Sequence, residues 1–161
     1  MTQEEKRVAA HILLGTIISD EELLLADLSA KLQYGVYCRY KAKEFMGIEL
    51  TDYNSWLIGI DQRYGHYWES YFENHGLNCP ISIFIYQGAE KIPVVKPYLR
   101  SLSSMTEEER KVYEYLTLCN TPEGISKLTN WLDKKMFDHR GLIPKGLAIE
   151  VTGENNPYKI Y

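Results

Sequence analysis

The chain has 161 residues, of which 45% are hydrophobic and 25% are charged, and its formal net charge is −4 at pH 7. This length and apolar content predict a single domain, residues 1–161, with one core. The mild negative charge gives little general attraction to phosphate, and it is far too small for a mimic of DNA.

The three cysteines, Cys38, Cys79 and Cys119, are widely spaced and form no CxxC pair. This pattern predicts free thiols in a reducing compartment, and neither a disulfide framework nor a zinc site. No apolar run approaches the roughly 20 residues that a membrane-spanning helix needs. We therefore expect a cytoplasmic protein with no membrane contact, no metal and no cofactor.

Two helices are predicted at the N-terminus. Ser or Thr followed three residues later by Glu is typical of a capping box, and this pattern occurs at residues 2–5 and again at 19–22. The first helix is expected to run to about residue 15. The second is expected to end near Gly35, because glycine permits the left-handed residue that closes a helix.

The apolar period changes to two at about residue 36, which predicts strands. Short runs rich in β-branched and aromatic residues, bounded by polar turns, indicate further strands. The expected result is an antiparallel meander of about four strands, at residues 36–43, 55–60, 81–86 and 92–95.

Two further helices and a return strand are predicted after the meander. Thr106 and Glu109 form a third capping box, which opens a helix with its apolar side chains at 112, 115, 116 and 119. Thr121-Pro122 opens the next helix, with Ile125, Leu128, Trp131 and Leu132 facing inward. Residues 147–151 are expected to return as a strand, and residues 152–161 to form an exposed tail.

Strands in one block with helices on either side predict an α+β fold. Its expected parts are an N-terminal helical hairpin, an antiparallel sheet of about four to five strands, two further helices and a C-terminal return strand.

Two blocks in the last third of the chain, KPYLRSLSSMTEEE at residues 96–109 and FDHRGLI at 137–143, resemble a family of small proteins encoded by phages and prophages of gut bacteria. The resemblance covers roughly residues 27–161. It implies a phage or mobile-element setting and no particular activity. Most of the predicted hairpin, residues 1–33, precedes the family's usual start, so this segment is interpreted as an accessory element. We expect the two blocks to be principally a folding device.

Asp138, His139 and Arg140 form the sharpest cluster of ionisable side chains. In a catalytic role, Asp138 or His139 would be the acid or base. In a structural role, Asp138 and Arg140 would pair locally or cap the preceding helix while Gly141 turns the chain. The structural role is favoured, because ion-pair networks imitate functional sites. In the resembling family the middle position is usually tyrosine, which titrates near ~10 rather than ~6.5, so acid–base chemistry at His139 would not be a shared function.

Arg100 lies between a predicted strand and the third capping box. Its guanidinium would hold a phosphate or carboxylate, and Ser103 and Ser104 would add hydroxyl donors near the helix N-terminus. Alternatively, Arg100 pairs inside the domain and the serines compete for the cap position. This alternative is favoured, because helix ends need caps far more often than they bind anions.

Thirteen tyrosines is a high count for this length, and residues 63–72 alone contain five aromatic side chains. If exposed, Tyr64, Tyr67 and Tyr71 would form an interaction surface, because tyrosine offers a large contact area with few rotatable bonds. As a strand, the same segment would place Trp68 and Phe72 in the core. The area that each aromatic side chain buries favours the core.

The strand expected at residues 36–43 has a basic outer face. Alternation places Arg39, Lys41 and Lys43 on one side, together with Tyr37. Basic side chains that contact phosphates and an aromatic ring that stacks on a base would make this face a nucleic-acid site.

Three functions follow from these features. We prefer a non-enzymatic interaction protein of a phage or mobile element, with a host or phage protein as its partner, because no glycine-rich phosphate loop, GxSxG or HExxH motif occurs. The first alternative is a nucleic-acid-binding module that uses the basic strand face. The second is an enzyme or binder for a small anionic ligand, with Arg100 and Arg140 as anion clamps.

Overall fold

The computed structural model describes residues 2–3, 19–43, 50–63, 67–73, 81–87 and 92–159. The helix predicted over residues 2–15 falls almost entirely outside this part of the chain. The helices are α2 (Asp20–Leu32), α3 (Glu107–Thr117) and α4 (Pro122–Lys134), and a short 3-10 helix, η1 (Leu102–Ser104), precedes α3. Among these helices, none has the length and apolar character that crossing a bilayer requires.

A six-stranded mixed sheet forms the other half of the fold, in the order β4-β3-β2-β1-β7-β8. Its neighbouring strands are antiparallel except for β8, which runs parallel to β7. The strands are β1 (Tyr37–Lys43), β2 (Leu50–Arg63), β3 (Tyr67–Phe72), β4 (Ile81–Phe84), β7 (Val95–Leu99) and β8 (Ile149–Glu150). Helix first, then strands, then two helices and a final strand confirm the predicted α+β class.

The strands differ from the predicted ones in several places. β3 adds a strand to the predicted meander, the run predicted at 92–95 divides between the short β6 (Ile92–Pro93) and β7, and the return strand predicted at 147–151 is limited to β8. β2 is more than twice as long as the predicted 55–60, because it pairs with β1 through its first half and with β3 through its second. The strand predicted at 81–86 breaks at Ile85. After the break, β5 (Tyr86–Gln87) pairs with β6 (Ile92–Pro93) as a separate ribbon.

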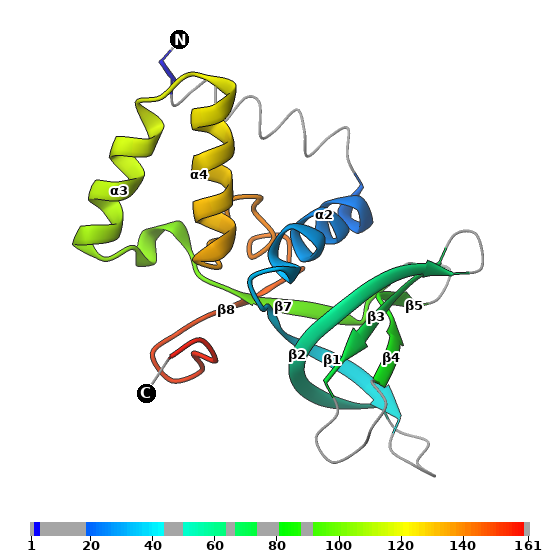
Figure 1. Ribbon diagram of the computed structural model, residues 1–161. Coiled ribbons are helices and arrows are strands. Elements are labelled where there is room, and N and C mark those ends of the chain that lie inside the picture. The colour runs from blue at the N-terminus through cyan, green and yellow to red at the C-terminus, as the bar shows by residue number, and fades with distance from the viewer. Residues whose placement is uncertain are drawn as a thin grey trace.

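The core lies between α2 and the concave side of the curved sheet (Figure 1). Leu24 and Leu28 of α2 are fully buried, and on the sheet Tyr40 stacks on Phe72 with ring centroids 4.3 Å apart. β3 therefore places Phe72 in the core, as the favoured interpretation of residues 67–72 required. Ser19 and Glu22 form the predicted capping box of α2.

The helices α3 and α4 stand beside each other as a hairpin at one end of the sheet (Figure 1). Their caps are confirmed: Thr106 and Glu109 form a capping box, and Thr121 caps α4 with proline in the first turn. The predicted inward stripes are wrong in part. Tyr115 is 69% exposed and Ile125 is 57% exposed, and α3 contains no buried residue.

After β8 the C-terminal segment curls back on itself beside the sheet (Figure 1). Residues 152–155 are exposed, as predicted for a tail, whereas residues 156–158 are half-buried. The hydroxyl of Tyr158 accepts a hydrogen bond from the backbone N–H of Tyr37 at 3.0 Å and donates one to the carbonyl of Tyr98 at 2.8 Å. These bonds attach the segment to the first residue of β1 and to β7.

Candidate functional site

The Asp138-His139-Arg140 triplet follows α4 in a tight turn, and its members have separate partners. The buried carboxylate of Asp138 accepts the backbone N–H groups of Leu142 at 2.7 Å and Ile143 at 2.9 Å. Gly141 has a φ of 77°, the left-handed region that favours glycine. Asp138 thus holds the turn itself, and it is Arg140 that pairs with carboxylates elsewhere.

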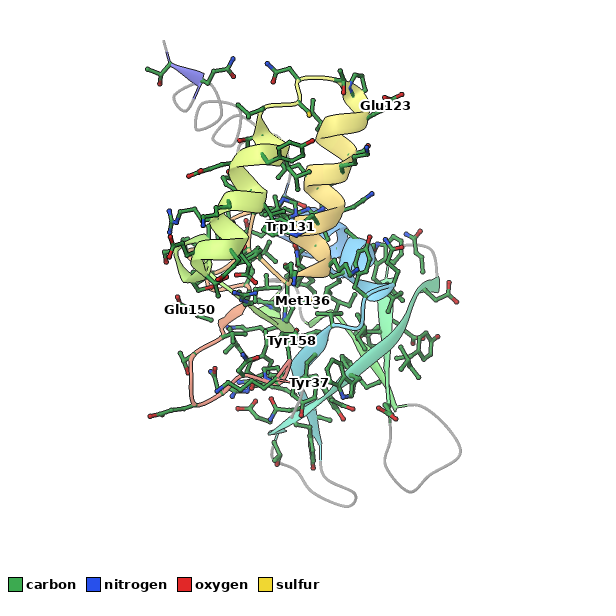
Figure 2. All side chains as sticks on the ribbon, turned by 60° about the vertical axis from the view of Figure 1, so that its left-hand side comes forward. Tyr37, Glu123, Trp131, Met136, Glu150 and Tyr158 are labelled. Carbon is green, nitrogen blue, oxygen red and sulfur yellow. The ribbon has the colours of Figure 1, made fainter. Side chains whose placement is uncertain are left out.

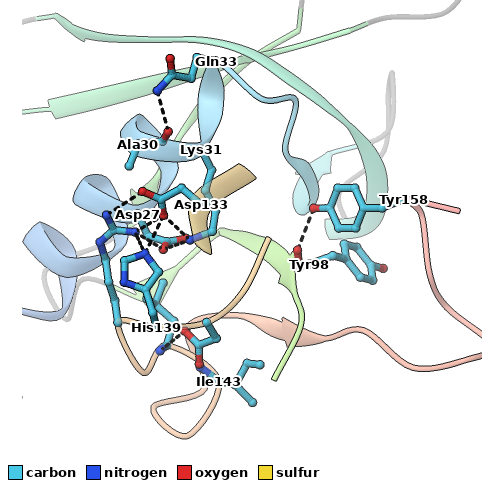
Figure 3. Close-up of polar contacts among 12 residues, drawn as sticks. Asp27, Ala30, Lys31, Gln33, Tyr98, Asp133, His139, Ile143 and Tyr158 are labelled. Atoms are coloured by element: carbon cyan, nitrogen blue, oxygen red, sulfur yellow. Dashed lines mark hydrogen bonds and ion pairs between the residues drawn. The ribbon is translucent and has the colours of Figure 1, made fainter. Parts of the chain in front are cut away.

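Arg140 belongs to a buried ion-pair network with Asp27 and Lys31 of α2 and Asp133 of α4 (Figure 3). Its Nη1 lies 2.9 Å from Asp27 Oδ1 and 2.7 Å from Asp133 Oδ1. Lys31 Nζ donates to the same oxygen of Asp133 at 3.1 Å and also to Asp27. Two cations therefore alternate with two carboxylates.

His139 completes the network through a 2.7 Å contact between its Nε2 and Asp133 Oδ1. Burial lowers the pKa of His139, and the charges of Arg140 and Lys31 lower it further, against the hydrogen bond to Asp133, which raises it. Burial by itself would raise the pKa of Asp133, but hydrogen bonds from His139 and Arg140 and the Lys31 charge hold it well below its usual range. The folded state thus favours a neutral imidazole and an ionised Asp133.

The same residues offer three donor atoms in metal-like proximity. One ligand atom each of Asp27, Asp133 and His139 lies within 4.8 Å of the others. However, Lys31 and Arg140 already donate to Asp27 Oδ1 and Asp133 Oδ1, and Arg140 also donates to Asp133 Oδ2, so that Asp27 Oδ2 is the one oxygen of these two carboxylates without a partner. A metal ion would lie beside two fixed cations that already neutralise the two carboxylates, so this donor set does not fit one. The network joins α2, α4 and the turn at 138–141 instead.

Arg100 is held by Glu109 and by an aromatic ring. Its two terminal nitrogens contact the two carboxylate oxygens of Glu109 at 2.9 and 2.8 Å, and its guanidinium carbon lies 4.3 Å from the centre of the Phe137 ring. The hydrogen bond from Arg100 lowers the pKa of Glu109. Arg100 therefore pairs inside the domain, as the favoured interpretation predicted, and its contact with Glu109 connects the end of β7 to α3. Arg100 and Arg140 hold different carboxylates.

The serines before α3 bond among themselves. Ser104 donates to the carbonyl of Ser101 at 2.7 Å, and the hydroxyls of Ser101 and Ser103 lie 3.0 Å apart. Thr106 supplies the side-chain cap of α3.

Of the three tyrosines in the predicted interaction surface, only the side chain of Tyr71 is described by the structure. Tyr64 and the side chain of Tyr67 lie outside the described residues. Tyr71 is half-buried, and its hydroxyl donates to Glu69 at 3.1 Å.

The strand that carries the predicted basic face is present as β1. The side chain of Lys43 lies outside the described part of the chain. Arg39 donates to the hydroxyl of Tyr98 at 2.9 Å, and Lys41 is exposed. The ring of Tyr37 lies 5.0 Å from the ring of Trp56 on the neighbouring strand, with the two planes steeply inclined. The face is therefore aromatic at one end and basic at the other.

A pocket of about 580 Å³ opens beside this face, where the sheet, the end of α4 and the C-terminal segment meet. We call it the basic pocket, because four of the eleven residues that line it are Lys or Arg, whereas Asp and Glu are absent from the described lining. Three aromatic side chains also line it. The eleven residues are Tyr34, Gly35, Trp56, Arg100, Lys134, Lys135, Met136, Asn156, Pro157, Tyr158 and Lys159.

The end of α4 shapes one wall of the basic pocket. The N–H of Met136 bonds to the carbonyl of Asp133 and the N–H of Phe137 to that of Leu132, which is the Schellman arrangement. Met136 occupies the left-handed position, with a φ of 61°, although its side chain is buried. This turn ends the helix directly after Lys134 and Lys135 and places both lysines at the rim.

Comparisons with protein-family models, with curated proteins and with solved structures found no match. The resemblance to phage-encoded proteins and the expected host or phage partner therefore stay predictions.

Proposed function

We propose that the protein binds a small anionic ligand with a planar ring system, such as a nucleotide, in the basic pocket. The observation that supports the proposal is the lining itself: four basic side chains and, among the described residues, no acidic one, in a chain of net charge −4. A cavity lined by one sign of charge concentrates ligands of the opposite sign. Its volume also lies within the usual range for small-molecule sites.

The positive charge comes from three lysines and not from Arg100. Glu109 neutralises Arg100 through both carboxylate oxygens. In the described part of the chain, no carboxylate lies within ion-pair distance of Lys134, Lys135 or Lys159. Lysine at a helix C-terminus is favourable on its own, which accounts for Lys134. Lys159 comes from the C-terminal segment and not from α4. The helix C-terminus therefore does not explain why all three lysines line the same pocket.

The aromatic side chains that line the basic pocket favour a ligand with a planar group. The rings of Trp56 and Tyr158 lie 5.9 Å apart and are steeply inclined to each other, so they form a corner and not a closed stack. Both side chains are half-buried. A flat ring system that packs against one of them buries apolar surface while its phosphate reaches the lysines.

The lining favours binding over catalysis. Among its described residues there is no carboxylate, imidazole, thiol or serine hydroxyl, the groups that most often act as acid, base or nucleophile. His139 and Asp138, the predicted acid–base candidates, have their contacts in the buried network and the turn.

Isothermal titration with ATP and with adenosine tests the proposal. We expect ATP to bind, adenosine to bind far more weakly, and the affinity for ATP to fall with added salt. The double variant K134E/K135E should lose about tenfold or more in affinity, because each charge-assisted hydrogen bond is worth roughly 1.5–3 kcal/mol. Lys127→Glu is the matched control, since Lys127 is exposed on α4 and does not line the pocket. Equal affinities for the wild type and K134E/K135E at equal thermal stability would place the ligand elsewhere.

A further inference from the structure

We infer that the occupant of the basic pocket is one nucleotide of a single-stranded nucleic acid, whose adjoining nucleotides lie along the outer face of β1, β2 and β7. The inference rests on the proposed function and extends it from the pocket to the neighbouring surface.

Strand register defines that outer face. Tyr37 pairs with Trp56, and Arg39 pairs with Asn54 on one side and Lys96 on the other. Directly opposed residues in antiparallel strands share one face. The alternate residues of β1, Cys38 and Tyr40, are buried in the core. The side chains of Arg39, Lys41 and Lys96 therefore lie on the side of the sheet away from the core.

The outer face and the basic pocket form one surface. Trp56 lines the pocket and also contacts Tyr37. Tyr158 lines the pocket and hydrogen-bonds the backbone of Tyr37 and Tyr98. Figure 2 shows Met136, Tyr158 and Tyr37 following one another from the end of α4 to the sheet. A chain that leaves the pocket past Trp56 therefore reaches Tyr37 and then Arg39.

The charges along this route match a phosphate backbone. Lys134, Lys135 and Lys159 lie at the pocket end, and Arg39, Lys96 and Lys41 lie along the sheet. Register places Asp52 opposite Lys41 on this face, and Asp61, farther along β2, lies on it opposite Glu69 of β3. A groove that combines basic residues with exposed aromatic edges is the usual arrangement for unpaired nucleotides, because bases stack on rings while phosphates contact cations.

A single strand fits these features better than a duplex. Half-buried aromatic rings at Tyr37, Trp56 and Tyr158 offer their contacts to base faces, which a duplex keeps stacked inside. Arg39 is also held against the Tyr98 ring, 5.7 Å from its centre, and is thereby positioned for a backbone phosphate.

The test compares a fluorescein-labelled 12-mer of thymidine with thymidine monophosphate, by anisotropy and by competition. We expect the 12-mer to bind at least tenfold more tightly than the mononucleotide. K41E/K96E should weaken only the 12-mer and reduce the slope of log affinity against log salt by about 0.7 for each lost phosphate contact. K134E/K135E should weaken both ligands. K111E/K127E, which changes the same charge on exposed positions of α3 and α4, should weaken neither.

The outcomes separate the two proposals. If the mononucleotide binds in the pocket but the 12-mer binds no more tightly, or if K41E/K96E leaves the 12-mer unaffected, the inference is wrong and the proposed function stands. If neither ligand binds at 50 mM salt, the inference is wrong, and the ATP titration then decides the proposed function separately.

Discussion

At the scale of single residues, the buried network shows how the same sequence pattern can have two meanings. Asp27 and Lys31 are four residues apart on α2, a spacing that is typical of an exposed ion pair. Here both side chains are fully buried, and Asp133 and Arg140 from distant segments supply further ion pairs to them, although Asp27 Oδ2 has no hydrogen-bond partner. The partners lie more than 100 residues away in the chain. The spacing of Asp27 and Lys31 in the sequence therefore could not predict that the pair is buried.

A pH dependence of stability follows from His139. Its pKa is lower in the folded state than the ordinary value of about 6.5. As the pH falls through 6.5, the His139 imidazole becomes protonated in the unfolded chain but stays neutral in the folded protein, so the free energy of unfolding decreases. Below pH 6.5, the contribution from one such group changes by at most about 1.4 kcal/mol per pH unit. The lowered pKa of Asp133 changes the stability only at lower pH, near and below the unfolded value of about 3.9.

His139→Gln should therefore flatten the pH dependence, whatever it does to stability at pH 7. Urea unfolding at pH 7, 6 and 5 measures this difference in slope between the variant and the wild type. The other histidines, His11, His66 and His75, are present in both proteins and cancel in the comparison. Parallel stability curves over this range would show that His139 titrates in the folded protein as it does in the unfolded chain.

At the scale of elements, the helix caps and strand alternation could be predicted because they depend on neighbouring residues. Ser19, Thr106 and Thr121 each accept the expected backbone hydrogen bond. The burial of the helix faces could not be predicted in the same way. The apolar stripe of α3 is visible in the sequence, but whether another element covers it is a property of the whole fold, and Tyr115 is largely exposed.

Two leucines test this difference with the same chemical change. Leu142 in the FDHRGLI block is fully buried, whereas Leu118 after α3 is 79% exposed. Leu142→Ala should lower the free energy of unfolding by about 2–5 kcal/mol, and Leu118→Ala should change it by less than about 0.5 kcal/mol. Urea melts of both variants measure the contrast. A small effect at Leu142 would contradict the interpretation of this block as a folding device.

At the scale of the whole molecule, the basic pocket exists only because segments that are far apart in the sequence converge. Lys134 and Lys135 are adjacent in the chain, and this pair is the one visible signal. The residues around Trp56 and Lys159 in the sequence do not indicate that these two side chains lie near Lys134 and Lys135. The segment predicted as an exposed tail returns to the sheet and supplies residues 156–159 of the lining. By contrast, Tyr37, Arg39 and Lys41 could be placed on one face from alternation alone.

The hydroxyl of Tyr158 bonds this segment to β1 and β7, and these bonds give the final prediction. Tyr158→Phe keeps the ring but leaves the backbone N–H of Tyr37 without the acceptor that it has at 3.0 Å. An unsatisfied backbone group in a half-buried position costs about 1–3 kcal/mol. We expect a loss of stability of this size and, because Tyr158 and Lys159 then leave the wall of the pocket more readily, weaker binding of ATP.

Tyr115→Phe is the matched control, since the Tyr115 side chain is 69% exposed and lies on the hairpin away from the pocket lining. It should change neither the urea midpoint nor the affinity. Burial raises the pKa of the Tyr158 hydroxyl far above the ordinary value of about 10, so that this group stays protonated and able to donate to Tyr98 throughout the working pH range. A Tyr158→Phe protein with wild-type stability and affinity would show that ring packing against Trp56, and not the hydroxyl, holds the segment in place.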